Sequence, residues 1–143
     1  MTAADSTTAA PKLRALAAPV AVAGAAAASV ALLHWRDPHV SGAYGFCPFH
    51  RLTGLWCPAC GGLRAVNDLT DGHVIAALSS NIFVLPLILV VAAAWVRWTV
   101  LRWKGAAVRV PELPKPALGV LVAVLLLFTV ARNTPWAHWL APA

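Results

Sequence analysis

The sequence predicts an all-α integral membrane protein with three transmembrane helices, plus one or two short interfacial helices around a cysteine loop. Two observations on composition support this prediction: the 143-residue chain is 60% hydrophobic, and only 11% of its residues are charged. A soluble domain usually carries about 25% charged residues, so this chain has too little polar surface to fold in water. The third observation is that the apolar residues gather in three long runs. Each run is close to the ~20 residues that a bilayer-spanning helix needs.

The apolar runs predict where the chain crosses the membrane. Basic residues or tryptophans bound them, and both residue types favour the headgroup region at the ends of a span. Small polar residues precede the first run, and a polar, proline-rich loop separates the second run from the third. We therefore expect a disordered tail over residues 1–11 and a single membrane domain over residues 12–143, with spans at 15–35, 82–103 and 113–132.

The first span has a second interpretation, which is a cleaved signal peptide. Lys12 and Arg14 would form the basic region of such a peptide, and the alanine-rich run contains A-x-A cleavage patterns. The run is longer than the roughly 7–15 residues typical of a signal-peptide core. Its length therefore favours a retained helix over a cleaved signal peptide.

All three cysteines fall in a segment between the first two spans, residues 44–70. The last part of this segment, GGLRAVNDL, places Leu63, Val66 and Leu69 on one face of a short helix. An Asp-Gly turn signal follows, and HVIAALSSN then predicts a second short helix at the membrane interface.

The basic residues predict the orientation and the partners of the chain, whose net charge is +6. They lie at the ends of apolar runs rather than in a polar cluster, which argues for a lipid bilayer and against nucleic acid as a partner. The positive-inside rule places the N-terminus in the cytoplasm and the cysteine segment outside, in a multi-pass protein of the cytoplasmic membrane. Seven of the eleven basic residues then face inward: Lys12, Arg14, Arg97, Arg102, Lys104, Arg109 and Lys115.

The spacing Cys47-x9-Cys57-x2-Cys60 allows three interpretations. Three thiolates can hold a metal ion such as zinc, with His50 or His73 as the candidate fourth ligand. Alternatively, the CPAC pair is a thiol–disulfide couple in which Cys57 attacks and Cys60 resolves the mixed disulfide. In the third interpretation, one disulfide staples the loop and the remaining cysteine is free.

Five further residues near the cysteines are expected to have structural roles. Thr53 and Gly54 form a turn signal, and Gly61 follows the last cysteine directly. Arg64 lies about one helical turn beyond Cys60, from where it can bond loop carbonyls, pair with Asp68 at i+4, or hold an anionic group.

The segment resembles a known family through the pattern C-P-x4-T-G-x2-C-P-x-C-G-x2-R, which begins at Cys47 and ends at Arg64. This pattern is similar to the signature of small bacterial membrane proteins grouped as domain-of-unknown-function family 2752, over about residues 44–90. His73 and Ile82 depart from the family pattern, in which an acidic residue and a proline are usual. The resemblance implies a polytopic membrane protein and brings no established activity.

These residues favour a non-enzymatic membrane protein whose cysteine segment is a structural or metal-holding knot. Such a knot would present an extracytoplasmic surface to a protein partner or to a second copy of the chain. The clustered cysteines have no paired general acid and base beside them. The alternative is a membrane thiol–disulfide oxidoreductase that uses Cys57 and Cys60. A transporter would need ionisable residues within its spans, and none lies near the middle of a predicted span.

Overall fold

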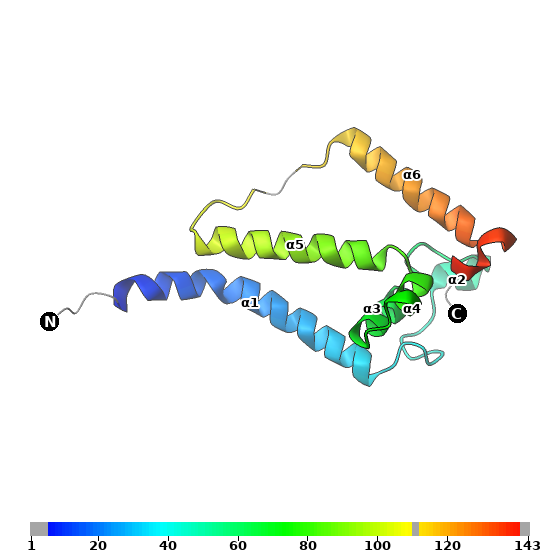
Figure 1. Cartoon of the computed structure of the whole chain (residues 1–143), viewed down its shortest axis with the longest axis horizontal. Helices are drawn as coiled ribbons and strands as arrows, with labels where there is room; N and C mark the ends of the chain where they lie inside the picture. The colour runs from blue at the N-terminus through cyan, green and yellow to red at the C-terminus, as the bar shows by residue number, and fades with distance from the viewer. Residues whose placement is uncertain (1–5, 110–111, 141–143) are drawn as a thin grey trace.

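The computed structural model describes residues 6–109 and 112–140, which form helices and no strand (Figure 1). Three of its helices contain segments long and apolar enough to cross a membrane: Arg14–Trp35, Val84–Trp103 and Lys115–Arg132. The predicted fold class is therefore confirmed, and the chain is a multi-pass membrane protein. The elements are α1 (Ser6–Trp35), α2 (Pro48–Thr53), α3 (Gly62–Thr70), α4 (Val74–Ser80), α5 (Val84–Trp103), α6 (Lys115–Arg132) and the 3-10 helix η1 (Pro135–Leu140).

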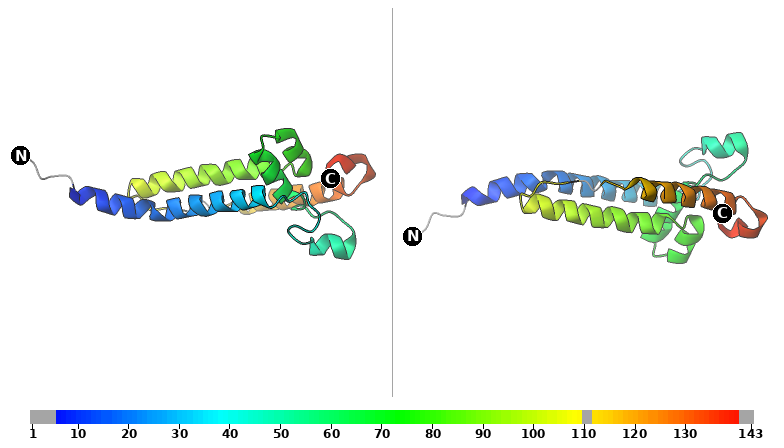
Figure 2. Two further views of the ribbon diagram at one scale, coloured as in Figure 1. Left: turned by 90° about the horizontal axis from the view of Figure 1, so that it is seen from below. Right: turned by 90° about the horizontal axis from the view of Figure 1, so that it is seen from above.

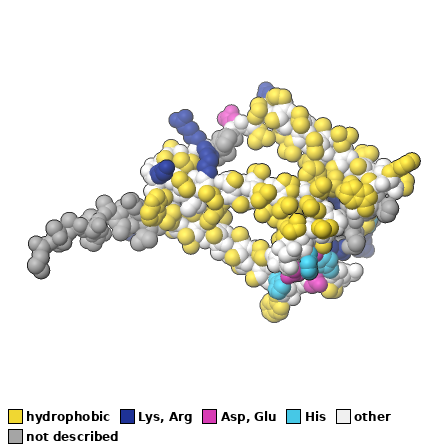
Figure 3. Space-filling view, in the orientation of Figure 1, with side chains coloured by type: hydrophobic (Ala, Val, Ile, Leu, Met, Phe, Trp, Pro, Cys, Tyr) yellow, Lys and Arg dark blue, Asp and Glu magenta, His cyan; other side chains and the backbone are white. Residues whose placement is uncertain are grey.

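The long helices leave their apolar side chains uncovered by the rest of the chain. Leu89 on α5 is 62% exposed and Leu127 on α6 is 70% exposed, and Figure 3 shows hydrophobic side chains spread over the long helices. In water, so much exposed apolar surface on a monomer would cause association. A lipid bilayer is therefore the solvent that this arrangement requires.

The first helix begins earlier than the sequence analysis predicted. A disordered tail was expected over residues 1–11, but α1 already starts at Ser6. Ala9 and Ala10 have the highest intrinsic preference for helix, and they extend the alanine-rich span toward the N-terminus. Residues 1–5 lie outside the described part of the chain.

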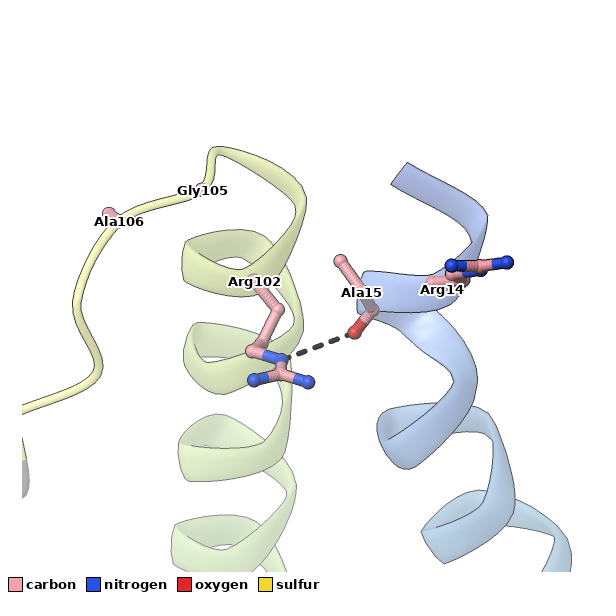
Figure 4. A pocket seen from close by; sticks show the side chains of 5 residues that line it. All are labelled: Arg14, Ala15, Arg102, Gly105 and Ala106. Carbon is pink, nitrogen blue, oxygen red and sulfur yellow. Dashed lines mark hydrogen bonds between the residues drawn. The ribbon is translucent and has the colours of Figure 1, made fainter. Parts of the chain in front are cut away.

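The helices α1 and α5 run side by side, as Figures 1 and 2 both show. Pro19 has no N–H to offer the carbonyl of Ala15, one helical turn earlier, so that carbonyl needs another donor. Arg102 supplies it from α5, with its Nε donating to Ala15 O at 3.2 Å (Figure 4). Trp95 Nε1 donates to Pro19 O at 3.2 Å, so two hydrogen bonds join α5 to α1 around the proline.

The short helices gather at the opposite end of the α1–α5 pair. There α3 and α4 lie on one side of the long helices and α2 on the other (Figure 2). Ala65 on α3 and Ala77 on α4 are almost fully buried, and their small side chains allow these helices to pack closely. Asn67 on α3 donates to the carbonyl of Leu33 at 3.1 Å, which joins the pair to the end of α1.

Candidate metal centre

The three cysteines converge at this end of the molecule. The Sγ atoms of Cys47 and Cys57 are 3.6 Å apart, and those of Cys57 and Cys60 are 2.7 Å apart. All three sulfurs lie within 4.8 Å of one another, and all three cysteines are free thiols. Within the described ranges, no other set of three histidine, cysteine or acidic side chains brings its ligand atoms together in this way.

Helix α2 positions the first cysteine. Cys47 occupies the N-cap position, and Pro48 follows as the first helical residue, where its fixed φ favours a helix start. The helix ends after six residues at Gly54, whose φ of 72° is left-handed and favours glycine. Thr53 Oγ1 accepts the N–H of Leu55 at 3.2 Å, so side chain and backbone together close the turn.

The turn that carries the other two cysteines is held by the last residue of α6. Arg132 Nη1 donates to Cys57 O at 2.8 Å, and both of its terminal nitrogens lie 3.3 Å from Cys60 O. Nη2 also donates to Leu140 O at 3.0 Å, and the guanidinium lies 4.9 Å from the centre of the Phe128 ring. One side chain therefore ties the cysteine turn to the end of the third span.

Two asparagines complete the support of the same turn. Trp56 N–H donates to Asn133 Oδ1 at 2.7 Å, and Asn133 Nδ2 donates back to Trp56 O at 2.9 Å. Asn81 Nδ2 lies 2.9 Å from Pro58 O and 3.1 Å from Cys60 O. The carbonyls of the turn are thus fixed by Asn81, which lies just before α5, and by Asn133, which lies just after α6.

The buried charge of Arg132 has no acidic partner in the described structure. Its residue is 1% exposed, its Nε has no hydrogen-bond partner, and the described ion pairs all join a histidine to an aspartate. A buried cation without a counter-charge is strongly destabilising. Ionised sulfurs of Cys57 and Cys60, whose carbonyls Arg132 already contacts, would supply that counter-charge.

The cysteines differ in how readily they ionise. The backbone N–H of His50, at the start of α2, lowers the pKa of Cys47 because it favours the thiolate. Burial, followed by the hydrogen bond with Cys57, raises the pKa of Cys60 to about 12. Metal binding would have to ionise Cys60, because a bound cysteine is a thiolate.

Neither predicted fourth ligand joins the sulfur cluster. The ring of His50 stacks on Trp56 with centroids 3.9 Å apart, and its Nδ1 lies 3.2 Å from Leu55 O. His73 is the residue before α4, where its backbone N–H donates to Asp68 O at 2.8 Å. The group of converging ligands contains only the three cysteines among the residues searched.

The other predicted structural residues lie around the cluster. Arg64 Nε donates to Pro38 O at 3.3 Å, a carbonyl that lies before the cysteine segment. The Asp68 carboxylate instead contacts His39 Nε2 at 3.3 Å and accepts Ser80 Oγ at 3.1 Å. Gly61 leads from the last cysteine into α3 with a φ of 80°.

The sequence does not point to the three side chains that hold the turn: Arg132, Asn133 and Asn81. In the sequence, Arg132 is simply the basic residue at the end of the third span. The only feature of the sequence that could have revealed them is the Arg-Asn pair directly after the third apolar run. An arginine at that position is more simply explained as a solvated cation at the membrane surface than as a buried one.

Comparison with known proteins yields a family match over this part of the chain. No curated protein and no solved structure matches the chain. The matching family covers the cysteine cluster, the two short helices after it and more than half of α5. Residues 47–95 match the family model described as "Protein of unknown function (DUF2752)", which confirms the family resemblance predicted from the cysteine motif.

Proposed function

We propose that Cys47, Cys57 and Cys60 hold a single metal ion of the zinc type. The resulting knot would fix the segment between the first two spans as a rigid surface for a protein partner outside the cytoplasmic membrane. The observation that carries the proposal is the convergence of the three sulfurs beside a buried arginine, Arg132, for which the described residues provide no carboxylate partner.

The distances between the sulfurs support a metal centre. Two thiolates on a tetrahedral zinc ion are about 3.8 Å apart, because each Zn–S bond is about 2.3 Å long. The 3.6 Å separation of Cys47 and Cys57 matches that value. Cys57 and Cys60 are 2.7 Å apart and need only a modest side-chain rotation to reach it.

The charges support the same conclusion. Three thiolates around a divalent ion carry a net charge of −1. Arg132 contributes +1 at the backbone of the same turn, and the assembly is then neutral. A neutral, hydrogen-bonded assembly removes the penalty that each buried charge would have alone.

The knot would join parts of the chain that are far apart in the sequence. Cys47 belongs to the start of α2, the Cys57–Cys60 turn precedes α3, and Arg132 ends α6. Small structures with little buried core depend on such cross-links. Here the described buried hydrophobic residues are Leu33, Ala65, Ala77 and Phe128, and only the two alanines belong to the short helices between the spans, which is a small core.

A thiol–disulfide oxidoreductase is the second candidate, and the 2.7 Å between Cys57 and Cys60 favours it. In this case the two thiols lose two protons and two electrons to a partner disulfide, which becomes two thiols as Cys57 and Cys60 form a bond. Cys47, 3.6 Å from Cys57, would then be a third thiol able to enter the exchange.

The metal and thiol content of the detergent-purified protein separates the two candidates. The metal knot predicts one bound ion per chain by elemental mass spectrometry, its loss in Cys57→Ser, and its retention in the control Ser79→Ala on the exposed side of α4. The redox candidate predicts no metal, a Cys57–Cys60 disulfide in peptide maps, and a mixed disulfide trapped by Cys60→Ser. A metal-free protein with three unreactive thiols would refute both.

A further inference from the structure

The candidate metal centre borders an open cavity. Its volume is about 460 Å³, and its walls include Cys47, Cys60, His50, Trp56 and Arg64. Most of a glycine-containing loop, residues 38–46, also lines the cavity. This loop turns back on itself through a bridge between Gly42 and Gly45. Two of the three sulfur-bearing residues therefore face a space large enough for a small organic molecule.

Three cysteines leave one position of a tetrahedral ion unfilled. Structural zinc sites are closed by four protein ligands, whereas sites with three protein ligands keep a position for an exogenous molecule. His50 lines the cavity and has a side chain that can bind a metal ion. However, its ring is stacked on Trp56, and its Nδ1 lies 3.2 Å from Leu55 O. Among the side chains that the structure describes, none completes the set.

The surroundings of the cavity favour an anion. None of its lining residues is acidic, and Arg64 contributes a guanidinium whose Nε donates to Pro38 O. In the described part of the chain, Asp37 and Asp68 pair with the His39 ring, and neither forms an ion pair with Arg64.

Two further arginines lie against the aromatic walls of the cavity. Arg36 lies 5.7 Å from the centre of the Tyr44 ring, and Arg51 lies 4.3 Å from that of Phe46. Both rings line the cavity. The cavity thus combines apolar walls with a cationic border, which suits an organic anion better than a hydrated inorganic one.

We propose that this cavity admits a low-molecular-weight thiol, which binds the metal ion as its fourth ligand with Arg64 beside it. The incoming thiol gives its proton to solvent and displaces a metal-bound water, so that a metal–sulfur bond replaces a metal–oxygen bond. The added charge of −1 is balanced by Arg64, as the first −1 is balanced by Arg132. The inference rests on the proposed metal knot and makes that knot a receptor for small thiols.

Cobalt(II) substitution tests this proposal on the full-length protein in detergent, with a phosphine as the reductant so that no other thiol is present. Sulfur-to-cobalt absorption reports the cysteine ligands, and its intensity rises when a further thiolate binds. We expect 2-mercaptoethanol to produce a saturable increase and ethanol, which lacks the sulfur, to produce none. Arg64→Gln should weaken the thiol affinity about tenfold, whereas Arg64→Lys should retain most of it.

A cavity-filling variant keeps the test decisive if Arg64→Gln does not fold. Ser41→Trp should bind cobalt through the cysteines and lose the response to 2-mercaptoethanol. A protein that binds no cobalt through its cysteines contradicts the metal knot itself. A cysteine-bound cobalt that ignores 2-mercaptoethanol contradicts only the thiol proposal. The thiol proposal is also contradicted if His50→Ala alters the cobalt spectrum before thiol is added, because a protein ligand then fills the fourth position.

Discussion

At the scale of the residue, Arg132 is the most constrained polar side chain in the described structure. It is 1% exposed and contacts the carbonyls of Cys57, Cys60 and Leu140. Some residues do not touch a metal ion but form hydrogen bonds that orient its ligands. Removing such a residue commonly lowers the metal affinity by about 10–100-fold. This guanidinium holds part of the cysteine turn and would balance the charge of the proposed metal centre.

Replacing Arg132 should therefore weaken metal binding without touching a metal ligand. We expect Arg132→Gln to lower the metal affinity by about 10–100-fold, because two carbonyls lose their donor and the thiolates lose their counter-charge. Competition with a coloured chelator measures this affinity. Arg97→Gln is the control, since Arg97 is exposed and, among the described residues, bonds Arg109 O. Equal affinities in the two variants would contradict the role of Arg132.

The cysteines should also differ in their reactivity with pH when the protein is metal-free and reduced. The pKa of Cys47 is lowered by the His50 N–H, so its reactive thiolate forms at a lower pH than that of an ordinary cysteine. The pKa of Cys60 is raised to about 12, so this thiol stays protonated and slow across the neutral and mildly alkaline range. Alkylation rates of the individual cysteines in the wild-type chain, followed by mass spectrometry of their peptides against pH, should rise first for Cys47. The reverse order would contradict this arrangement.

Single residues show what the sequence could and could not predict about the site. The three cysteines could be grouped because their spacing is short and their chemistry is shared. Arg132 and Asn133 could not, since about 75 residues separate them from the turn they hold and their partners are backbone carbonyls, which carry no sequence signal. His50 has the right chemistry for a ligand, but the stacking that occupies it depends on the final position of Trp56.

At the scale of the element, the long helices were predictable and α2 was not. A span of ~20 apolar residues identifies itself by length and composition alone. Helix α2 has only six residues, too few for a hydrophobic period, and isolated helices so short are unstable in water. It exists here because Pro48 favours its start, Gly54 ends it, and the folded chain around it holds Cys47 in place.

The end of α2 gives a matched pair of glycine substitutions. An added Cβ meets nothing within 4 Å at Gly54 or at Gly24, but only Gly54 has a positive φ, of 72°. Gly54→Ala should therefore destabilise the turn by about 1–2 kcal/mol, while Gly24→Ala in α1 should be neutral or slightly stabilising. Hydrogen exchange of the α2 amides measures the difference. Unchanged protection in Gly54→Ala would show that the left-handed turn does not limit α2.

At the scale of the whole molecule, the arrangement of spans places the cysteines at one membrane surface and most basic residues at the other. Arg97, Arg102 and Lys104 lie at the far end of α5 from the cysteine cluster (Figure 1). If the positive-inside rule holds, the cluster faces away from the cytoplasm.

Labelling from one side of the membrane measures this orientation. In intact cells treated with a chelator and a reductant, a membrane-impermeant maleimide should label Cys47. It should not label a cysteine introduced by Lys104→Cys in a variant without the native cysteines until the membrane is opened. The opposite pattern would invert the topology and place the cluster in the cytoplasm.

The attachment of α6 has a mechanical consequence. Within the described ranges, α6 packs against η1 and makes no close backbone contact with α1 or α5, from which it diverges in Figure 1. Its anchorage is the final turn, through Arg132, Asn133 and the edge-to-face contact of Phe128 with Phe83. The third span is thus attached at one end, with a hinge beside the sulfur cluster. Loss of the contacts at this hinge would change the tilt of α6 across the whole thickness of the membrane.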